Sequence, residues 1–296
     1  MMRKISVIGS GTMGIGIAQT FLMNNFKVNL IDISKKSLEQ SFKRMELSLE
    51  KMLVKKNITK KIYDNSLRNI SLSTDLESSL NGIELVVEAI PENFNLKCKL
   101  FKEIDSICDS DVIFASNTSS ISITKLAAFT SRPDKFIGMH FMNPVPLMKL
   151  VEIIKGFHTS KKVVDFIFSL SKGIHKFPVL VNDYPGFISN RILLPMINEA
   201  IYALYEKVAG VEEIDKVMIL GMSHPMGPLH LADFIGLDTC LSILEVLYQG
   251  FNNQKYAPCP LLVNMVNAGN LGVKTGEGFY LYGKNYNDKF VSNQFK

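Results

Sequence analysis

A glycine-rich turn between a short apolar run and a helical pattern constrains the fold of this chain more than any other feature. Ile5 to Ile8 reads as a buried strand, and the turn Gly9-Ser10-Gly11-Thr12-Met13-Gly14 follows it directly. Apolar residues then recur at helical spacing, and Lys27 to Asp32 reads as a second buried strand. A strand, a glycine turn, a helix and a strand form a βαβ unit, whose two strands run parallel.

The same turn matches the G-x-G-x-x-G pattern of dinucleotide-binding folds. Gly9 permits the tight turn, Gly11 lets the backbone approach a pyrophosphate, and Gly14 allows the helix to pack closely on the strand. Asp32 ends the second strand, where a carboxylate accepts hydrogen bonds from both adenosine ribose hydroxyls and repels a 2′-phosphate. We therefore predict an NAD site and favour NAD over NADP, with Lys35-Lys36 close enough to weaken that preference.

Later segments alternate between strand and helix patterns and then change character. Buried-strand patterns occur at Ile83–Val87, Val112–Ala115, Phe136–Met139, Leu150–Ile154 and Val179–Val181. Tyr184-Pro185-Gly186 is the strongest break in the chain, and mainly helical patterns follow it. We expect an α/β fold in which a Rossmann-like doubly wound sheet over residues 1–184 binds NAD, followed by an all-α domain over residues 185–296.

A basic segment interrupts the strand pattern soon after the second strand. Its apolar residues recur at spacings of 4, 3, 4 and 3, which predicts a long amphipathic helix within a helical hairpin inserted at residues 35–68. Lys35–Lys61 holds nine basic and three acidic residues, a net charge of +6 where the whole chain carries +5. Such a charge run indicates either a solvated helix face or an arm that binds an anion, and charge alone leaves both interpretations open.

His140 differs from the other histidines because it ends an apolar strand pattern and leads into a loop. Ligands of open parallel sheets bind at such carboxyl ends. Glu152 lies inside the apolar run Leu150–Ile154, where an unpaired carboxylate is costly. A returning strand would place Glu152 beside His140, as a base and the carboxylate that orients it. A structural histidine with an edge-strand glutamate is the alternative interpretation.

Small and polar residues follow another strand pattern, in the segment Ala115-Ser116-Asn117-Thr118-Ser119-Ser120. The simpler interpretation is a strand exit that caps the next helix. The functional interpretation is a set of hydrogen-bond donors around a nicotinamide ring and a substrate oxygen.

Composition argues against several other classes of protein. No apolar run approaches the roughly 20 residues that span a bilayer, and the stretch after Arg3-Lys4 is broken by glycines as no signal peptide would be. A net charge of +5 over 296 residues is too dilute to indicate nucleic acid. The four cysteines are widely spaced, which argues against a disulfide scaffold and a structural zinc site. We expect a cytoplasmic protein with no bound metal.

Several further motifs occur together in one family. They are S-N-T-S-S at 116–120, H-F-M-N-P-V-P-L-M-K-L-V-E at 140–152, P-G-F-I-x-N-R at 185–191, P-M-G-P at 225–228 and K-T-G-E-G-F-Y at 274–280. With the glycine turn they extend from about Lys4 to Tyr282, nearly the whole chain. The chain resembles the L-3-hydroxyacyl-CoA dehydrogenases, and most resembles the compact bacterial 3-hydroxybutyryl-CoA dehydrogenases among them.

The resemblance implies an enzyme that interconverts (S)-3-hydroxyacyl-CoA and 3-oxoacyl-CoA with NAD, on short acyl chains, in fatty-acid or butyrate metabolism. It implies four catalytic residues: His140, Glu152, Ser119 and Asn190. The cofactor site that it implies comprises Gly9, Gly11, Thr12, Met13, Gly14, Asp32, Glu92, Lys97, Ser119, Asn143 and Lys274. The residues that it implies for the acyl-CoA substrate are Ser48, Lys55, Ser119, Asn143 and Asn190. It further implies a homodimer formed through the C-terminal helical domain.

Three positions depart from the family pattern. Met142 stands where phenylalanine is common, His230 stands where an acidic residue is usual, and Asn93-Phe94-Asn95 differs from the usual sequence. They leave the details of the acyl pocket open. Two other functions also remain: a related dehydrogenase of a hydroxy or sugar acid without CoA, of the L-gulonate type, and a nucleotide-binding sensor without catalysis.

Overall fold

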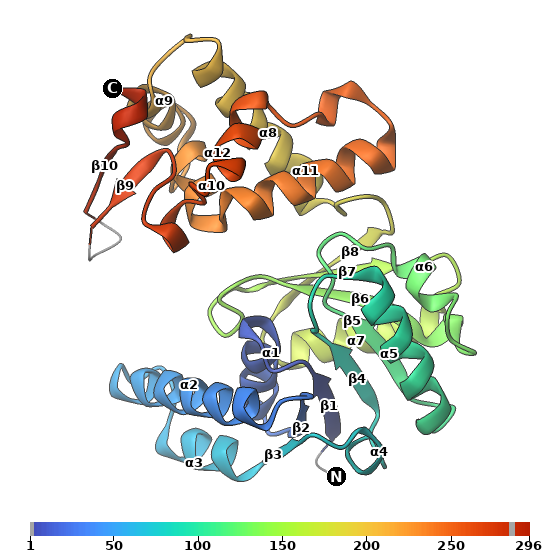
Figure 1. The fold of residues 1–296 in the computed structure, drawn as a ribbon. Helices are drawn as coiled ribbons and strands as arrows, with labels where there is room; N and C mark the ends of the chain where they lie inside the picture. Colours follow the sequence, from blue (N-terminus) through green and yellow to red (C-terminus); the bar gives the residue numbers. More distant parts are fainter. Residues whose placement is uncertain (1–2, 284–287) are drawn as a thin grey trace. The chain divides into compact units, whose positions relative to one another are not determined.

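The chain divides into two units, Met1–Tyr184 and Pro185–Lys296 (Figure 1). This computed structural model describes residues 3–283 and 288–296. The division follows the break that Tyr184-Pro185-Gly186 makes in the sequence. Each unit has its own cluster of buried apolar side chains.

The first unit is built on an eight-stranded sheet with the order β3-β2-β1-β4-β5-β6-β7-β8. Its strands are β1 (Lys4–Ile8), β2 (Lys27–Ile31), β3 (Ile70–Ser73), β4 (Leu85–Glu88), β5 (Ile113–Ser116), β6 (Phe136–Phe141), β7 (Leu150–Lys155) and β8 (Phe177–Asn182). Neighbouring strands are parallel except for β6 and β7, which are antiparallel. The order turns back between β1 and β4, so the expected doubly wound, Rossmann-like sheet is confirmed.

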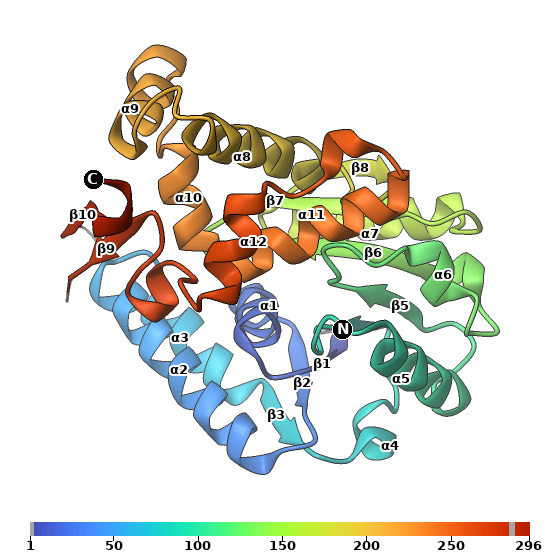
Figure 2. The ribbon, with the colours of Figure 1, turned by 45° about the horizontal axis from the view of Figure 1, so that its top comes forward.

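Helices cover both faces of this sheet (Figures 1 and 2). The helices of the first unit are α1 (Thr12–Met23), α2 (Lys35–Val54), α3 (Lys60–Arg68), α4 (Leu76–Ser79), α5 (Phe94–Ile107), α6 (Ile123–Ala127), α7 (Lys161–Gly173) and the 3₁₀ turn η1 (Pro133–Lys135). Apolar side chains of α1, α2 and α7 share one buried cluster with β1 and β6. On the other face, Phe101 of α5 contacts Phe136 of β6, with ring centroids 4.5 Å apart.

The basic insertion forms a helical hairpin, as expected, and its first helix contains all the apolar residues of the predicted helical pattern. Helix α2 ends at Val54, and α3 begins at Lys60. Lys56 has a positive φ of 58°, which ends the helix. Thr59 then caps α3 by accepting a hydrogen bond from the Ile62 amide. Four of the nine basic residues therefore lie beyond α2.

The second unit is mainly helical. It contains α8 (Ser189–Tyr205), α9 (Val211–Met222), α10 (Pro228–Ile235), α11 (Leu237–Phe251), α12 (Pro260–Asn267) and the 3₁₀ turns η2 (Gln254–Tyr256), η3 (Val273–Thr275) and η4 (Asn293–Phe295). It differs from an all-α domain in one respect, because β9 (Tyr280–Tyr282) and β10 (Lys289–Val291) form a small antiparallel sheet. On α8, Leu194, Ile197 and Ile201 form the buried side, whereas Ile192 is 65% exposed.

The glycine turn connects β1 to α1 by very close backbone contacts. Gly9 has a φ of +102°, which favours glycine. A Cβ at Gly14 would lie 1.8 Å from the Gly9 carbonyl oxygen, so only glycine lets α1 approach the turn. At Gly11, by contrast, no described atom lies within 4 Å of the position that a Cβ would take. The fold therefore requires Gly9 and Gly14, whereas Gly11 borders open space.

Replacing Gly14 with alanine should destabilise the first unit, because the new Cβ would overlap the Gly9 carbonyl oxygen. Overpacking of this kind typically costs about 1–3 kcal/mol, which lowers Tm by about 2–10 °C in a protein of this size. The matched control is Gly11→Ala, which meets no described atom and should change Tm much less. Thermal unfolding measures both variants, and equal stabilities would contradict the packing described for Gly14.

Candidate active site

Asp32 lies beside the glycine turn and is held in one orientation. It directly follows β2, and its Oδ2 accepts hydrogen bonds from the Ser10 amide at 2.8 Å and the Ser10 hydroxyl at 2.7 Å. Its Oδ1 accepts a bond from the Ser34 amide at 3.0 Å. The N-terminus of α1, which begins with Thr12 and Met13, thus lies next to an oriented carboxylate and the open space at Gly11. This arrangement fits a dinucleotide, with phosphates at the helix N-terminus and a ribose at the carboxylate.

A buried ion pair connects the end of β4 to α5. Of its two residues, the sequence predicted a role for Lys97 and none for Glu88. Lys97 of α5 is 1% exposed, and its Nζ donates to Oε1 of Glu88 at 2.5 Å and to the Ile90 carbonyl at 3.1 Å. Glu88 is fully buried at the end of β4, and its Oε2 accepts a bond from the Ser116 hydroxyl at 2.6 Å. Burial raises the pKa of Glu88, although Lys97 and these donors oppose the shift. Glu88 carries the signal that singled out Glu152: a carboxylate within an apolar strand.

Glu92 connects Lys97 to the segment that follows β5. One carboxylate oxygen lies 3.3 Å from the Lys97 Nζ. The other accepts hydrogen bonds from the Thr118 hydroxyl and from the amides of Ser119 and Ser120, at 2.5, 3.0 and 3.1 Å. Burial alone would raise the pKa of Glu92, but Lys97 and these donors hold it below its usual value. The structure therefore brings Glu92, Lys97 and Ser119 together. The N-cap of the next helix, α6, is Ser122, which lies after this segment.

His140 and Glu152 face each other across β6 and β7. They are direct partners in the antiparallel register, and the His140 Nδ1 lies 2.7 Å from the Glu152 Oε2. His140 is 6% exposed and Glu152 is fully buried. The expected pairing is confirmed. With Nδ1 directed at the carboxylate, Nε2 is the ring nitrogen that does not face Glu152.

Asn117 anchors the strand that carries the histidine, and the sequence did not single it out by itself. Its Oδ1 accepts a hydrogen bond at 2.9 Å from the amide of Phe141, the residue after His140. The backbone N–H of Asn117 donates to the backbone carbonyl of Glu88 at 2.8 Å. Asn117 therefore connects the ends of β4, β5 and β6, which lie at the same edge of the sheet.

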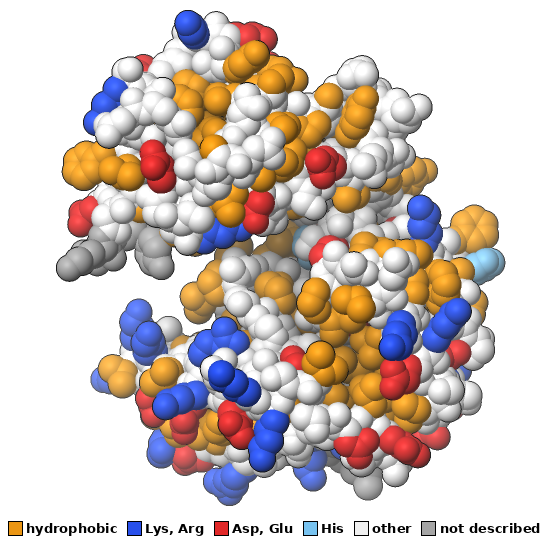
Figure 3. Space-filling model, in the orientation of Figure 1, with side chains coloured by type: hydrophobic (Ala, Val, Ile, Leu, Met, Phe, Trp, Pro, Cys, Tyr) orange, Lys and Arg blue, Asp and Glu red, His pale blue; other side chains and the backbone are white. Residues whose placement is uncertain are grey.

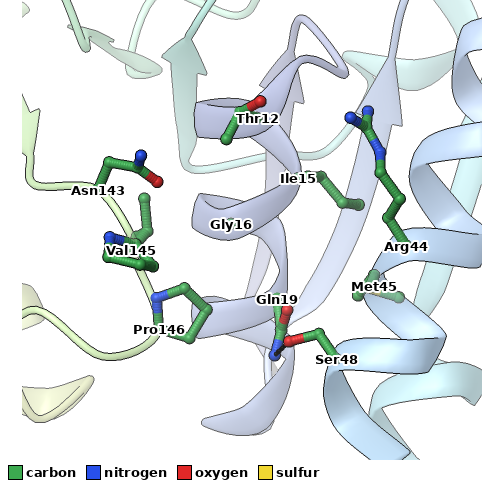
Figure 4. Close-up of a pocket in the computed structure, with 11 residues that line it drawn as sticks. Thr12, Ile15, Gly16, Gln19, Arg44, Met45, Ser48, Asn143, Val145 and Pro146 are labelled. Atoms are coloured by element: carbon green, nitrogen blue, oxygen red, sulfur yellow. Dashed lines mark hydrogen bonds between the residues drawn. The ribbon is translucent and has the colours of Figure 1, made fainter. Parts of the chain in front are cut away.

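A cavity of about 190 Å³ lies between α1, α2 and the loop after β6 (Figure 4). Its lining includes Thr12 and Gln19 of α1, Ser48 of α2 and Asn143 of the loop. The Gln19 Nε2 donates to the Ser48 Oγ at 3.1 Å, so this pair of polar groups lies at the cavity. The structure thus brings Ser48 and Asn143 to one cavity beside the first turn of α1.

Lys and Arg side chains gather over the α2–α3 hairpin (Figure 3). Lys55 is exposed at the C-terminal end of α2, as are Lys51 and Lys56 close to it. Arg44, farther back along α2, borders the cavity and donates to the Ser41 hydroxyl at 2.7 Å. The hairpin therefore presents positive charge that is accessible to an anion.

Two site residues expected from the resemblance belong to the second unit. Asn190 lies in the first turn of α8 and is 8% exposed. Lys274 lies in η3, where its ammonium pairs with the Asp238 carboxylate. His230, one of the departures from the family pattern, stacks on the Tyr282 ring in the same unit.

The described residues offer no group of three or more His, Cys, Asp and Glu side chains suited to a metal ion. Among the same residues no helix is long and apolar enough to cross a membrane. Cys98, Cys108, Cys240 and Cys259 are all buried free thiols.

A doubly wound sheet, a glycine turn with an oriented aspartate, and a buried imidazole–carboxylate pair at the same edge define an NAD-dependent dehydrogenase. Comparison with known proteins agrees. The family model of the 3-hydroxyacyl-CoA dehydrogenase NAD binding domain matches residues 4–184, and the model of the 3-hydroxyacyl-CoA dehydrogenase C-terminal domain matches residues 186–282. The chain belongs to the 3-hydroxyacyl-CoA dehydrogenase family.

Individual relatives are similar over nearly their full lengths. The chain is 52% identical to the probable 3-hydroxybutyryl-CoA dehydrogenase of Bacillus subtilis, over 95% of this chain and 97% of that protein. It is 49% identical to the 3-hydroxybutyryl-CoA dehydrogenase of Clostridioides difficile, over 95% of this chain and 100% of that protein. The crystal structure of (S)-3-hydroxybutyryl-CoA dehydrogenase PaaH1 from Ralstonia eutropha superposes with a TM-score of 0.93 at 48% identity, covering 96% of this chain and 100% of that one.

Proposed function

We propose that this protein interconverts (S)-3-hydroxyacyl-CoA and 3-oxoacyl-CoA with NAD, and that 3-hydroxybutyryl-CoA and acetoacetyl-CoA are its substrates. The observation that carries the proposal is the buried His140–Glu152 pair at the sheet edge that also holds the glycine turn. The names of the relatives at about 50% identity support the short acyl chain. The accessible positive charge of the α2–α3 hairpin suits the phosphates of CoA, which favours a CoA thioester over a free hydroxy or sugar acid.

His140 would take the proton from the C3 hydroxyl at its Nε2 during oxidation and return it during reduction. Glu152 accepts the Nδ1 hydrogen bond, which fixes the ring orientation and stabilises the imidazolium once the proton has moved. NAD, when bound, supplies the ring that takes up the hydride from C3. Because Glu152 is fully buried, its charge has little competition from water and acts strongly on the imidazole.

We assign supporting roles to the remaining site residues. Ser119 and Asn190 would hydrogen-bond the reacting oxygen and position the substrate, and Asn143 would contact the substrate as well. Lys97, whose ammonium is buried against two carboxylates, would act on the cofactor through Glu92 rather than by direct contact. We propose that the cofactor is also contacted by the glycine turn, Asp32, Asn143 and Lys274. We propose that the CoA part of the substrate is contacted by Ser48 and Lys55.

Replacing His140 with glutamine should abolish most turnover of acetoacetyl-CoA, because the proton then lacks an acceptor and donor. Loss of a general base typically lowers kcat by about 10²–10⁴-fold. Glu152→Gln should lower kcat less, since it removes the charge but keeps a polar partner. NADH binding, measured by fluorescence, should stay nearly unchanged in both. A His140→Gln enzyme with normal kcat would refute the mechanism.

Lys55→Glu should raise KM for acetoacetyl-CoA because attraction to the CoA phosphates becomes repulsion. We expect a rise of about tenfold, which corresponds to about 1.4 kcal/mol of binding free energy. A short pantetheine thioester, which lacks the nucleotide phosphates, should be much less affected. Lys99→Glu is the matched control, since Lys99 is an exposed lysine of α5, over the other face of the sheet. Equal losses for CoA and pantetheine substrates, or for both variants, would show that the hairpin is only a solvated surface.

We also propose that the protein is a homodimer formed through its second unit. Helix α9 exposes Val217, Leu220 and Met222, which are 60%, 81% and 61% exposed, and Val208 just before it is 73% exposed. Clustered apolar side chains of this kind mark an interaction surface.

The mass of the protein in solution, measured by sedimentation, tests the dimer. The wild-type protein should have twice the chain mass, and Leu220→Asp should shift it toward the monomer, since a charge would be buried in the interface. Val54→Asp is the control, because Val54 is equally exposed, at 82%, but lies on α2 of the first unit. A monomeric wild type, or a dimer that Leu220→Asp does not weaken, would contradict this interface.

A further inference from the structure

Lys176 is a buried lysine next to the loop at residues 142–149, which joins β6 to β7. It precedes β8, is 6% exposed, and was not singled out by any sequence motif. Its Nζ donates hydrogen bonds to two carbonyl groups of the loop, that of Val145 at 2.5 Å and that of Met148 at 2.7 Å. One ammonium group therefore holds the loop at two points.

The charge of Lys176 is not balanced by an acidic partner. Among the described residues, no ion pair includes it. Burial lowers its pKa, because the charged form is poorly solvated there. A buried ammonium with carbonyl partners alone is unfavourable compared with an apolar side chain, so stability by itself does not explain this lysine.

The loop is held from its other side by α1. Val145 is 2% exposed, and a Cβ at Gly16 of α1 would lie 3.0 Å from the Val145 Cβ, so the loop and the helix are in close contact. Within the loop, the Pro144 carbonyl accepts bonds from the amides of Leu147 and Met148, both at 3.0 Å. The loop is thus a closed turn fixed between Gly16 and Lys176.

This turn forms one wall of the cavity between α1 and α2 (Figure 4). Asn143, Val145 and Pro146 line the cavity from the loop side, opposite Gln19 and Ser48. The position of the loop therefore sets both the width of the cavity and the place of the Asn143 side chain.

We propose that Lys176 is a positioning residue that holds the 142–149 loop against α1, and thereby shapes the cavity and places Asn143 for the acyl-CoA substrate. The inference rests on the proposed function, which identifies that substrate. Lys176 touches neither reacting atoms nor cofactor in this proposal. It acts only through the two loop carbonyls.

Steady-state kinetics with acetoacetyl-CoA test the proposal through three variants. Lys176→Met keeps a long unbranched side chain but donates no hydrogen bond, and it should raise KM about tenfold while kcat changes much less. Lys176→Arg keeps charged donors and should recover most of the loss. Lys172→Met, at an exposed lysine of α7 four residues earlier, should behave as wild type. Lys176→Met with wild-type kcat and KM would overturn the inference.

Hydrogen exchange followed by mass spectrometry gives a readout that does not depend on activity. In Lys176→Met the amides of Leu147 and Met148 should exchange faster, with the rest of the first unit unchanged. Faster exchange throughout the unit, a lowered Tm and no rescue by arginine would make Lys176 a general structural residue and overturn the proposal. If wild type shows no turnover of acetoacetyl-CoA, the proposed function fails, while the exchange comparison still tests the loop.

Gly16→Ala is a second variant that keeps the proposal falsifiable if Lys176→Met does not fold. Its new Cβ would lie 3.0 Å from the Val145 Cβ and push the loop away from α1. The same rise in KM for acetoacetyl-CoA is then expected. An unchanged KM in a folded Gly16→Ala protein would show that the loop position does not matter for the substrate.

Discussion

The reversal of strand direction between β6 and β7 is the constraint on which the rest of the first unit's site depends. The antiparallel register places Glu152 opposite His140 and Ile154 opposite Gly138. A Cβ at Gly138 would lie 2.7 Å from the Ile154 Cβ, so glycine allows the two strands to approach at this point. The same reversal creates the 142–149 loop, which brings Asn143 to the cavity. The β6–β7 hairpin thus places His140 beside its carboxylate partner, and its loop forms one wall of the cavity.

Buried charge gathers around the carboxyl edge of the sheet while the clusters on its faces are apolar. Glu88 with Lys97, Glu152 with His140, and Lys176 with two carbonyls are all nearly inaccessible to water. Burying such groups costs free energy that hydrogen bonds only partly offset. Their concentration at the end of the sheet that carries the glycine turn favours a role in holding backbone and side chains in fixed positions rather than in stability alone.

Local patterns in the sequence predicted the fold and part of the site. The glycine turn, the strand ending at Asp32 and the His140–Glu152 pair were predictable because apolar periodicity shows where strands end and where a carboxylate must be paired. Glu88 carried the same signal and was overlooked. Asn117 and Lys176 could not be found in this way, since their partners lie 24 and 31 residues away and neither interrupts an apolar run. Strand β3 was not predicted because its four residues, Ile70-Ser71-Leu72-Ser73, contain no run of apolar residues.

The hairpin origin of the His140–Glu152 pair also bears on how the molecule folds. The two residues are 12 positions apart in sequence, whereas the pairing of β1 with β4, at the centre of the sheet, joins residues 80 positions apart, such as Ile5 and Leu85. Closing a short chain segment loses less conformational entropy than closing a long one. Contacts of low sequence separation also form faster during folding. The imidazole and its carboxylate can therefore meet in a nascent hairpin before the central strands have joined, so the chemical pair does not have to await the completed sheet.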